Sequence, residues 1–268
     1  MASLKGPLEV EGNLKDLSIY KCRTSDKVIV RTKGGATKEQ IKRDPAFART
    51  RMINSEWSGA TQLGSLMRRS CYFLAEMSDY VLMGSINAIA NKMQRDDVEN
   101  PMGQRSFRLS NHKPLFNGFS FNRKFPFDSV VLTNIECRID RVGGTATVVI
   151  PPILANIQLK PFNKLPFLRF VVTLGGVSDL AYSALHQKYI PVVPHYATVG
   201  KFACTEWEMV CNDLPEKSIT IHLEADKYPI TDQVTLILGI GIQFGTIASD
   251  GKPEMVKYAG CGKILSVK

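Results

Sequence analysis

The sequence predicts an α+β fold with an N-terminal β-hairpin, two long antiparallel helices and a C-terminal antiparallel β-sandwich, immunoglobulin-like or similar. Three observations lead to this class: apolar residues alternate over residues 8–32, take helical spacing over residues 37–97, and alternate again from Pro114 onward. The chain has 268 residues, 44% of them hydrophobic, which is enough for a sizeable core. We expect a hairpin and helical region over residues 1–113 and a sandwich domain over residues 114–268.

Two short runs, "SIYK" and "KVIVRTK", flank the polar residues 23–26 and predict the two strands of the hairpin. Their apolar residues alternate with polar ones: Leu17, Ile19, Val28 and Val30. Two strands cannot close a core, so this face must lie on other parts of the chain or on a neighbour. Exposed strand edges invite pairing with another copy, although the basic residues of the second strand could block such pairing.

The helical region carries two start signals and one break. Thr37 and Gln40 have the spacing of a capping box, and Asp44-Pro45 places a capping residue before a proline at the first helical position. Ser78-Asp79 interrupts the pattern and predicts the cap of a second helix. The apolar residues expected on one face of the first helix recur mostly at threes and fours: Phe47, Ile53, Trp57, Ala60, Leu63, Met67, Cys71 and Leu74. Gly59, Gly64 and Gly84 would allow close helix packing.

Seven segments after Pro114 alternate and predict strands: "FNGFSFN", "SVVLTNIECRID", "ATVVIP", "LRFVVTLGGVS", "SITIHLEAD", "VTLILGIGIQF" and "GKILSVK". Turn residues separate them, and no helical pattern lies between them. Residues 234–244 form the most apolar segment, which indicates a central strand. Several short strands without intervening helices favour a two-sheet sandwich.

The positive charge is concentrated near the N-terminus. The chain carries a formal net charge of +9, and residues 21–51 alone hold ten Lys/Arg against three Asp/Glu. Ten residues make up this candidate interaction surface: Lys21, Arg23, Lys27, Arg31, Lys33, Lys38, Lys42, Arg43, Arg49 and Arg51. Nucleic-acid recognition would be favoured by aromatic residues among the basic ones, but only Tyr20 and Phe47 flank the stretch. The charge therefore marks an exposed surface that fits a partner or is simply solvated.

Several motifs allow a structural and a chemical interpretation. Lys33-Gly34-Gly35 lacks the spacing of a phosphate loop and is typical of a turn, although the next helix start offers a weak anion site. Arg49 and Arg51 cannot share a helix face; pairing with a carboxylate such as Glu56 is the structural alternative to phosphate or subunit contact.

Two acidic clusters also allow a structural and a chemical interpretation. The first, with Asp96, Asp97 and Glu99, is typical of a solvated linker but also resembles a metal-binding end of a helix. In the second, Glu206 and Glu208 would share one face of a strand, which is common on solvated strands and is also the arrangement of paired acid and base carboxylates.

No reaction can be assigned from these residues. The six cysteines contain no C-x-x-C pair and predict reduced thiols, and the four histidines are dispersed without zinc-ligand spacing. His186 and His195 flank "YIPVVPHY", which indicates a loop or an edge strand. No nucleophile motif is present. We therefore expect no cofactor, no metal and no enzymatic activity. The absence of a long apolar run and of a signal-peptide pattern favours a protein that is cytoplasmic or released without a cleaved signal peptide.

The order of the motifs "GNLKDLSIYK", "VRTKGG", "DPAFARTR", "MGQR", "LILGIGIQF" and "GKILSVK" resembles a widespread uncharacterised bacterial protein family. Its signature is G-x4-[IL]-S-[FI]-Y-K, R-x-K-G-G and D-P-A-F-x-R-T-R, with no established activity. This sequence has Met52-Ile53 where the family tends to have Glu-Asn. The resemblance spans nearly the whole chain and implies architecture only.

Three functional classes remain. The first is a non-enzymatic, self-assembling structural protein, such as a subunit of a filament, tube or phage-like particle, whose partner is another copy of itself. The second is a nucleic-acid-binding module that uses residues 21–51 for weak contacts with nucleic acid or another polyanion. The third is an enzyme with an unrecognised site.

Overall fold

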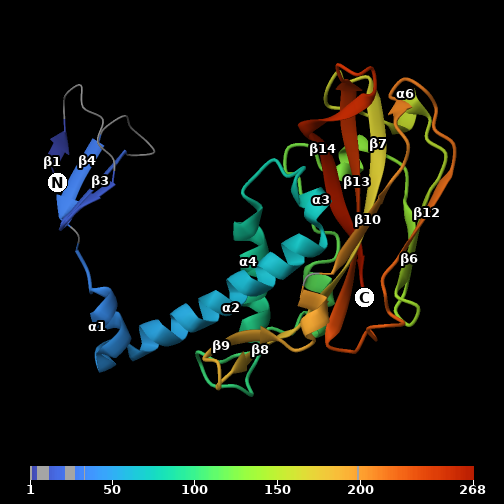
Figure 1. Ribbon diagram of the computed structural model, residues 1–268. Helices are drawn as coiled ribbons and strands as arrows, with labels where there is room; N and C mark the ends of the chain where they lie inside the picture. The colour runs from blue at the N-terminus through green and yellow to red at the C-terminus, as the bar shows by residue number, and fades with distance from the viewer. Residues whose placement is uncertain (1, 5–11, 22–27, 33, 198) are drawn as a thin grey trace. The chain divides into compact units, whose positions relative to one another are not determined.

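The computed structural model of this protein describes residues 2–4, 12–21, 28–32, 34–197 and 199–268. The fold belongs to the α+β class and combines helices with antiparallel sheets (Figure 1). The chain divides into two compact units, Met1–Arg51 and Met52–Lys268. The boundary expected from the sequence near residue 113 does not coincide with this division.

The N-terminal unit contains the predicted hairpin. Strands β3 (Leu17–Lys21) and β4 (Val28–Thr32) pair antiparallel with Ile19 opposite Val30. Two three-residue strands that the sequence did not indicate extend the hairpin on both sides, β1 (Ala2–Leu4) next to β4 and β2 (Gly12–Leu14) next to β3. The result is a four-stranded sheet of order β1-β4-β3-β2.

Both predicted helix starts are present. Helix α1 (Lys38–Arg43) begins with a complete capping box between Thr37 and Gln40. The carboxylate of Asp44 then accepts a hydrogen bond from the backbone N–H of Ala46, which opens a 3₁₀ turn, η1 (Pro45–Phe47). The long helix α2 (Ala48–Ser70) follows directly.

The second predicted helix is shorter than the first and does not run along it. After the short helix α3 (Tyr72–Ala75), helix α4 (Leu82–Arg95) crosses α2 (Figure 1). The crossing is close because Gly64 of α2 has no side chain: a Cβ there would lie 2.3 Å from Oδ1 of Asn87. Of the three helix glycines, Gly84 has no such neighbour, since a Cβ added there would have nothing within 4 Å.

The predicted cap of the second helix is wrong. Val81, and not Ser78 or Asp79, precedes the first turn of α4, without a side-chain cap. The carboxylate of Asp79 instead accepts hydrogen bonds from the backbone N–H groups of Arg123 and Lys124, at 2.8 to 3.1 Å. The Asp79 carboxylate therefore accepts hydrogen bonds from a loop that is distant in the sequence and does not cap helix α4.

The C-terminal sandwich has two antiparallel sheets. The five-stranded sheet has the order β10-β7-β13-β14, with β11 paired to β7: β7 (Phe167–Ser178), β10 (Gly200–Cys204), β11 (Glu208–Met209), β13 (Val234–Ile247) and β14 (Pro253–Val267). The three-stranded sheet has the order β12-β6-β5: β5 (Glu136–Asp140), β6 (Thr145–Ile150) and β12 (Lys217–His222). The segment expected to be central, β13, lies between β7 and β14.

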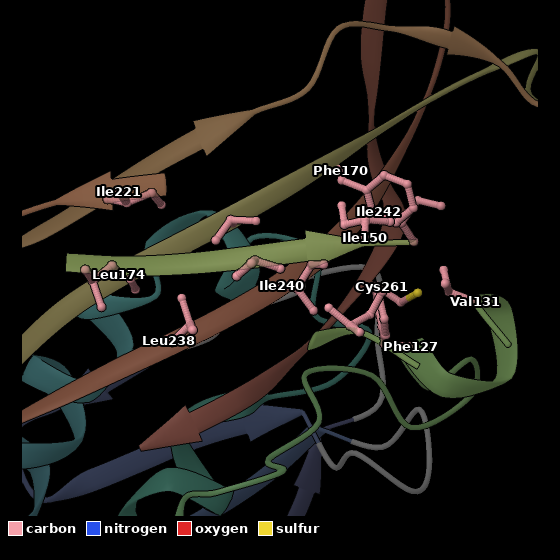
Figure 2. Packing of buried hydrophobic residues seen from close by; sticks show 14 of the residues in the cluster. Phe127, Val131, Ile150, Phe170, Leu174, Ile221, Leu238, Ile240, Ile242 and Cys261 are labelled. Carbon is pink, nitrogen blue, oxygen red and sulfur yellow. The ribbon is translucent and has the colours of Figure 1, made fainter. Parts of the chain in front are cut away.

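The first hydrophobic core lies between these two sheets. Figure 2 shows Ile150 and Ile221 of the three-stranded sheet with Phe170, Leu238 and Ile240 of the five-stranded sheet. All five side chains are buried. Every second residue of β13, from Leu236 to Phe244, belongs to this core, as strand geometry requires.

The other face of the five-stranded sheet carries the helices. A second core joins residues of α2, α3 and α4 to Val177, Ile237 and Ile264. The sheet presents glycine at the closest contacts: a Cβ on Gly175 would lie 2.5 Å from Cβ of Ser70, and one on Gly239 would lie 2.4 Å from Leu74. This double coverage explains why β13 is buried on both faces and why α3, α4 and α2 from Met52 onward belong to the same compact unit as the sandwich.

The remaining segments are connections. The predicted strand "FNGFSFN" is a loop with one isolated bridge, Ser120 to Lys263, and its Phe116 and Phe121 are fully buried. The segment "SVVLTNIECRID" forms the end of helix α5 (Phe127–Val130) before it becomes β5. The other connecting elements are η2 (Leu109–Asn111), η3 (Lys113–Leu115), α6 (Ala155–Gln158), β8 (Leu180–Ser183), β9 (Lys188–Pro191) and η4 (Pro194–Ala197).

Candidate interaction surface

The predicted basic surface is spread over several elements of the N-terminal unit and the start of α2. Seven of its residues are described by the structure, and all are exposed except Arg51, which is half-buried: Lys21, Arg31, Lys38, Lys42, Arg43, Arg49 and Arg51. Arg23, Lys27 and Lys33 lie outside the described residues. Gly35 has a φ of 99°, which glycine adopts readily, so the Gly34-Gly35 pair forms a bend before α1.

Arg51 closes the end of α1. Its Nη1 donates to the backbone carbonyl oxygens of Ile41 and Asp44, each at 2.8 Å. Carbonyl groups at the end of a helix lack partners within the helix, so a guanidinium group there satisfies them. The expected pairing of Arg51 with a carboxylate is therefore wrong, whereas Arg49, two residues earlier, is exposed.

The N-terminal sheet has one apolar face. Register places Val30 opposite Ile19 and Leu14 opposite Leu17, so these side chains lie on the same side of the sheet as Val28. The same side also carries Thr32, opposite Leu17, and Lys21, opposite Val28 at the end of the hairpin, so its apolar part is the patch of these five aliphatic residues. Leu14 is 64% exposed, and the others are half-buried. Among residues 12–21, 28–32 and 34–51, none is buried. The N-terminal unit therefore does not by itself bury these five side chains, although a small sheet needs its apolar face packed on something.

The opposite face of the sheet is mixed and carries polar residues, half-buried Ile29 and an aromatic residue. Tyr20 lies opposite Ile29, and Ser18 lies opposite Arg31. The guanidinium carbon of Arg31 is 5.4 Å from the centre of the Tyr20 ring, a cation–π distance. Tyr20 is 37% exposed, so it is a surface residue.

A buried charge cluster fixes the "MGQR" motif to α2. Glu56 accepts hydrogen bonds from Nε and Nη2 of Arg105, at 2.7 and 2.8 Å, and from the backbone N–H of Gly103 at 2.7 Å. Ser55 Oγ donates to the carbonyl oxygen of Gly103 at 2.7 Å. Gly103 has a φ of 93°, and a Cβ there would lie 3.0 Å from Cβ of Met52. Ser55 and Glu56 of α2 are thus joined to Gly103 and Arg105 of the distant "MGQR" motif, and we call this group the Glu56 clamp.

The Glu56 clamp is not suited to proton transfer. Burial acts to raise the pKa of Glu56, but the hydrogen bonds from Arg105 and Gly103 outweigh it and hold the pKa below its usual value. All of its hydrogen-bonding neighbours in the clamp are donors, so the carboxylate stays ionised and neutralised. The spacing of Glu56 and Arg105 in the sequence gave no sign of this pair.

The acidic segment after α4 is an ordered loop. Asp97 accepts hydrogen bonds from the backbone N–H groups of Glu99, Asn100 and Ser106 and from the side chain of Asn100. Burial opposes ionisation, but these bonds together lower the pKa of Asp97 to about 2. Glu99 pairs with Arg108 at 2.8 Å. The carboxylates are therefore engaged within the loop, and in the described part of the chain no group of three or more His, Cys, Asp or Glu has the arrangement of a metal site.

The second acidic cluster does not form a carboxylate pair. Only Glu208 belongs to a strand, and it pairs with Lys217 at 2.6 Å. Trp207 lies under Arg169, whose guanidinium carbon is 4.6 Å from the ring centre. Glu206 is exposed. Glu208 therefore has a structural ion pair and Glu206 is exposed, so the two do not form an acid and base arrangement.

One buried carboxylate lies beside a serine. Asp179 is only 4% exposed and accepts hydrogen bonds from Ser110 N at 3.0 Å and Ser110 Oγ at 2.5 Å. Burial raises the pKa of Asp179. The nearby His112 contacts Arg108 O and Asp96 through its two ring nitrogens, each at 2.8 Å. With its histidine engaged elsewhere, this pair does not form a nucleophilic triad.

The other histidines and the thiols have structural surroundings. His195 stacks on Tyr228 with ring centres 3.5 Å apart, and Nδ1 of His186 lies 3.0 Å from Ser183 Oγ. The five cysteines within the described residues are free. Burial raises the pKa of Cys71 and of Cys261 to about 12, so both thiols stay protonated and unreactive.

The predicted apolar face of α2 is buried over only half of its length. Ala60, Leu63 and Met67 of α2 pack in the second core, as does Leu74, which belongs to α3. The earlier members do not: Ile53 is 49% exposed and Trp57 is 51% exposed. Large exposed apolar residues on consecutive turns are a feature of protein contact surfaces. In the part of the chain that is described, no helix combines the length and the apolar character that a membrane crossing needs.

Comparison with protein-family models, curated proteins and solved structures gives no match for this chain.

Proposed function

We propose that this protein is a non-enzymatic structural subunit that assembles with copies of itself through its N-terminal sheet. The observation that carries the proposal is the apolar patch formed by Leu14, Leu17, Ile19, Val28 and Val30, none of which is buried. A matching apolar face on a second copy would remove this surface from water, at about 25 cal/mol per Å². Self-contacts of this kind build closed rings or open filaments, tubes and particles.

The test changes one face of the sheet at a time. Val30→Lys places a charge at the centre of the apolar face, and Ile29→Lys places the same charge on the adjacent residue of the same strand, which faces the other side. We expect the wild type and Ile29→Lys to form assemblies in light scattering and negative-stain electron microscopy, and Val30→Lys to be monomeric.

A truncated chain tests the proposal independently, in case the substituted sheets do not fold. Deletion of residues 1–33 removes the whole sheet, and the truncated chain should be folded and monomeric. A wild-type protein that is monomeric across the micromolar range would refute the assembly. An assembly that survives the deletion would place the joint elsewhere.

The opposite face of the same sheet favours a second candidate, weak nucleic-acid binding. Tyr20 and Arg31 form an exposed aromatic and cationic pair, which is the combination that single-stranded nucleic acids contact by stacking. Binding of this kind would fall on the order of 10³-fold between 50 and 200 mM salt if about six phosphates are contacted. Salt-independent binding, or no binding to single-stranded DNA at 50 mM salt, would argue against it.

A further inference from the structure

A cavity of about 620 Å³ lies between the turn that follows α3, the start of α4 and the first half of β14. Buried Met77 and Leu82 contribute to its lining, together with half-buried Met83 and Met255. Methionine side chains are flexible and polarisable, so a surface built from them adapts to apolar chains of different shape. The volume falls in the range of about 300–1,000 Å³ that is typical of small-molecule sites.

A distortion of β14 forms one wall of this cavity. Gln243 of β13 pairs with Gly260, whereas Gly245 pairs with Met255, so residues 256–259 bulge out of the sheet. Tyr258 lies in this bulge with a φ of 61°, a left-handed conformation that bulky residues rarely adopt. Strained backbone of this kind and β-bulges both concentrate at ligand sites.

The rim of the cavity is positively charged. Arg68 and Lys257 are exposed there, and neither takes part in a salt bridge within the described residues. Nζ of Lys257 lies 5.1 Å from the centre of the Tyr258 ring. Glu76 is the single acidic residue among those that line the cavity, and its carboxylate interacts with the Tyr72 hydroxyl.

We propose that this cavity binds a single-chain fatty acid, with its hydrocarbon chain against the methionines and its carboxylate at the rim beside Arg68 and Lys257. The apolar lining matches the chain, and two cations without carboxylate partners match an anionic head group. This inference stands on residues of the unit Met52–Lys268 and does not depend on assembly through the N-terminal sheet.

The experiment measures laurate binding to the full-length protein by isothermal titration calorimetry below the critical micelle concentration. We expect one laurate per chain and at least tenfold weaker binding of dodecyltrimethylammonium, which has the same chain and the opposite charge. Arg68→Glu should weaken laurate binding about tenfold or more. Arg69→Glu is the matched control, because Arg69 is an exposed neighbour that does not line the cavity.

Two further variants test the cavity itself. Met83→Trp should fill it and abolish binding, and Tyr258→Gly should relax the bulge and weaken binding. If Arg68→Glu does not fold, Lys257→Glu replaces it, with Lys252→Glu as control. The proposal is overturned if laurate gives no binding heat, if both head groups bind equally, or if the cavity variants bind laurate like the wild type.

Discussion

Individual side chains in this protein gain their roles from distant partners. Glu56 was a candidate partner for the arginines near it in the sequence, yet it binds Arg105 and Gly103, which lie in a loop beyond α4. Asp79 has the sequence context of a helix cap, yet it accepts from the backbone of residues 123 and 124. In contrast, Thr37 and Asp44 have the partners that local sequence predicts, because those partners are within three residues.

The carboxylate of Asp97 leads to a prediction about pH. Its pKa is about 2 in the folded protein, below the usual 3.8, so it stabilises the fold above about pH 4. This contribution disappears as the pH falls toward 2, because the folded state loses the ionised form that its hydrogen bonds favour. Asp97→Asn should therefore lower the stability at pH 7 and flatten the decline in stability between pH 4 and pH 2.

Urea denaturation at a series of pH values provides the measurement, with Asp232→Asn, an exposed aspartate, as control. A decline in the stability of Asp97→Asn that parallels the wild type would show that the loop hydrogen bonds do not set the acid sensitivity.

At the scale of elements, the alternation of apolar residues predicted the position of the long, regular strands. The segments that became β6, β7, β12, β13 and β14 alternate and pair as the sequence indicates. The loop around Phe116 and Phe121 alternates too, but its aromatic side chains pack in the second core without a strand partner. The alternation of apolar and polar residues indicates which side chains are buried, but it does not by itself show that the segment pairs with another strand.

The glycines of β7 and β13 give a prediction at this scale. Alanine at position 175 would place its Cβ 2.5 Å from Cβ and 2.6 Å from the carbonyl oxygen of Ser70, which is too close without movement of α2. Gly175→Ala should therefore destabilise the protein by about 1–3 kcal/mol. Gly84→Ala is the control: the helix position is open, and alanine should stabilise it by up to about 1 kcal/mol.

Thermal unfolding of both variants distinguishes these effects, because the melting temperature should fall for Gly175→Ala and rise or stay level for Gly84→Ala. A Gly175→Ala protein as stable as the wild type would mean that the helices tolerate displacement from the sheet.

For the whole molecule, the class of fold follows from the sequence, but the grouping of its parts does not. Period changes marked the long helices and most of the long strands, but not the loop around Phe116 and Phe121 or helix α5. They could not show that the helices cover the second face of the five-stranded sheet, because two positions on the helix-facing side of β13 are glycine and give no apolar signal. The contacts between the helices and the sheet join residues that are far apart in the sequence. For the same reason, neither the Glu56 clamp nor the cavity beside β14 was predictable.

This grouping changes the expected behaviour of fragments. Residues 114–268 alone would expose Val177, Ile237 and Ile264, which the helices cover. We therefore expect residues 52–268 to unfold cooperatively as a soluble fragment and residues 114–268 to aggregate or lack cooperative unfolding. Circular dichroism and calorimetry of the two fragments make the comparison. Cooperative unfolding of residues 114–268 would support the independent sandwich that the sequence first indicated.

The double coverage of β13 also bears on how the chain folds during synthesis. The helices α2 to α4 are made early, but the central strand of the sheet that they cover follows only after β5 to β12. Until β13 and β14 pair with β7, the apolar side of the helices has no sheet to pack on, and such long-range pairing is slow. We therefore expect a nascent chain of this protein to expose an apolar helical surface for much of its synthesis and to be bound there by chaperones that act on emerging polypeptides.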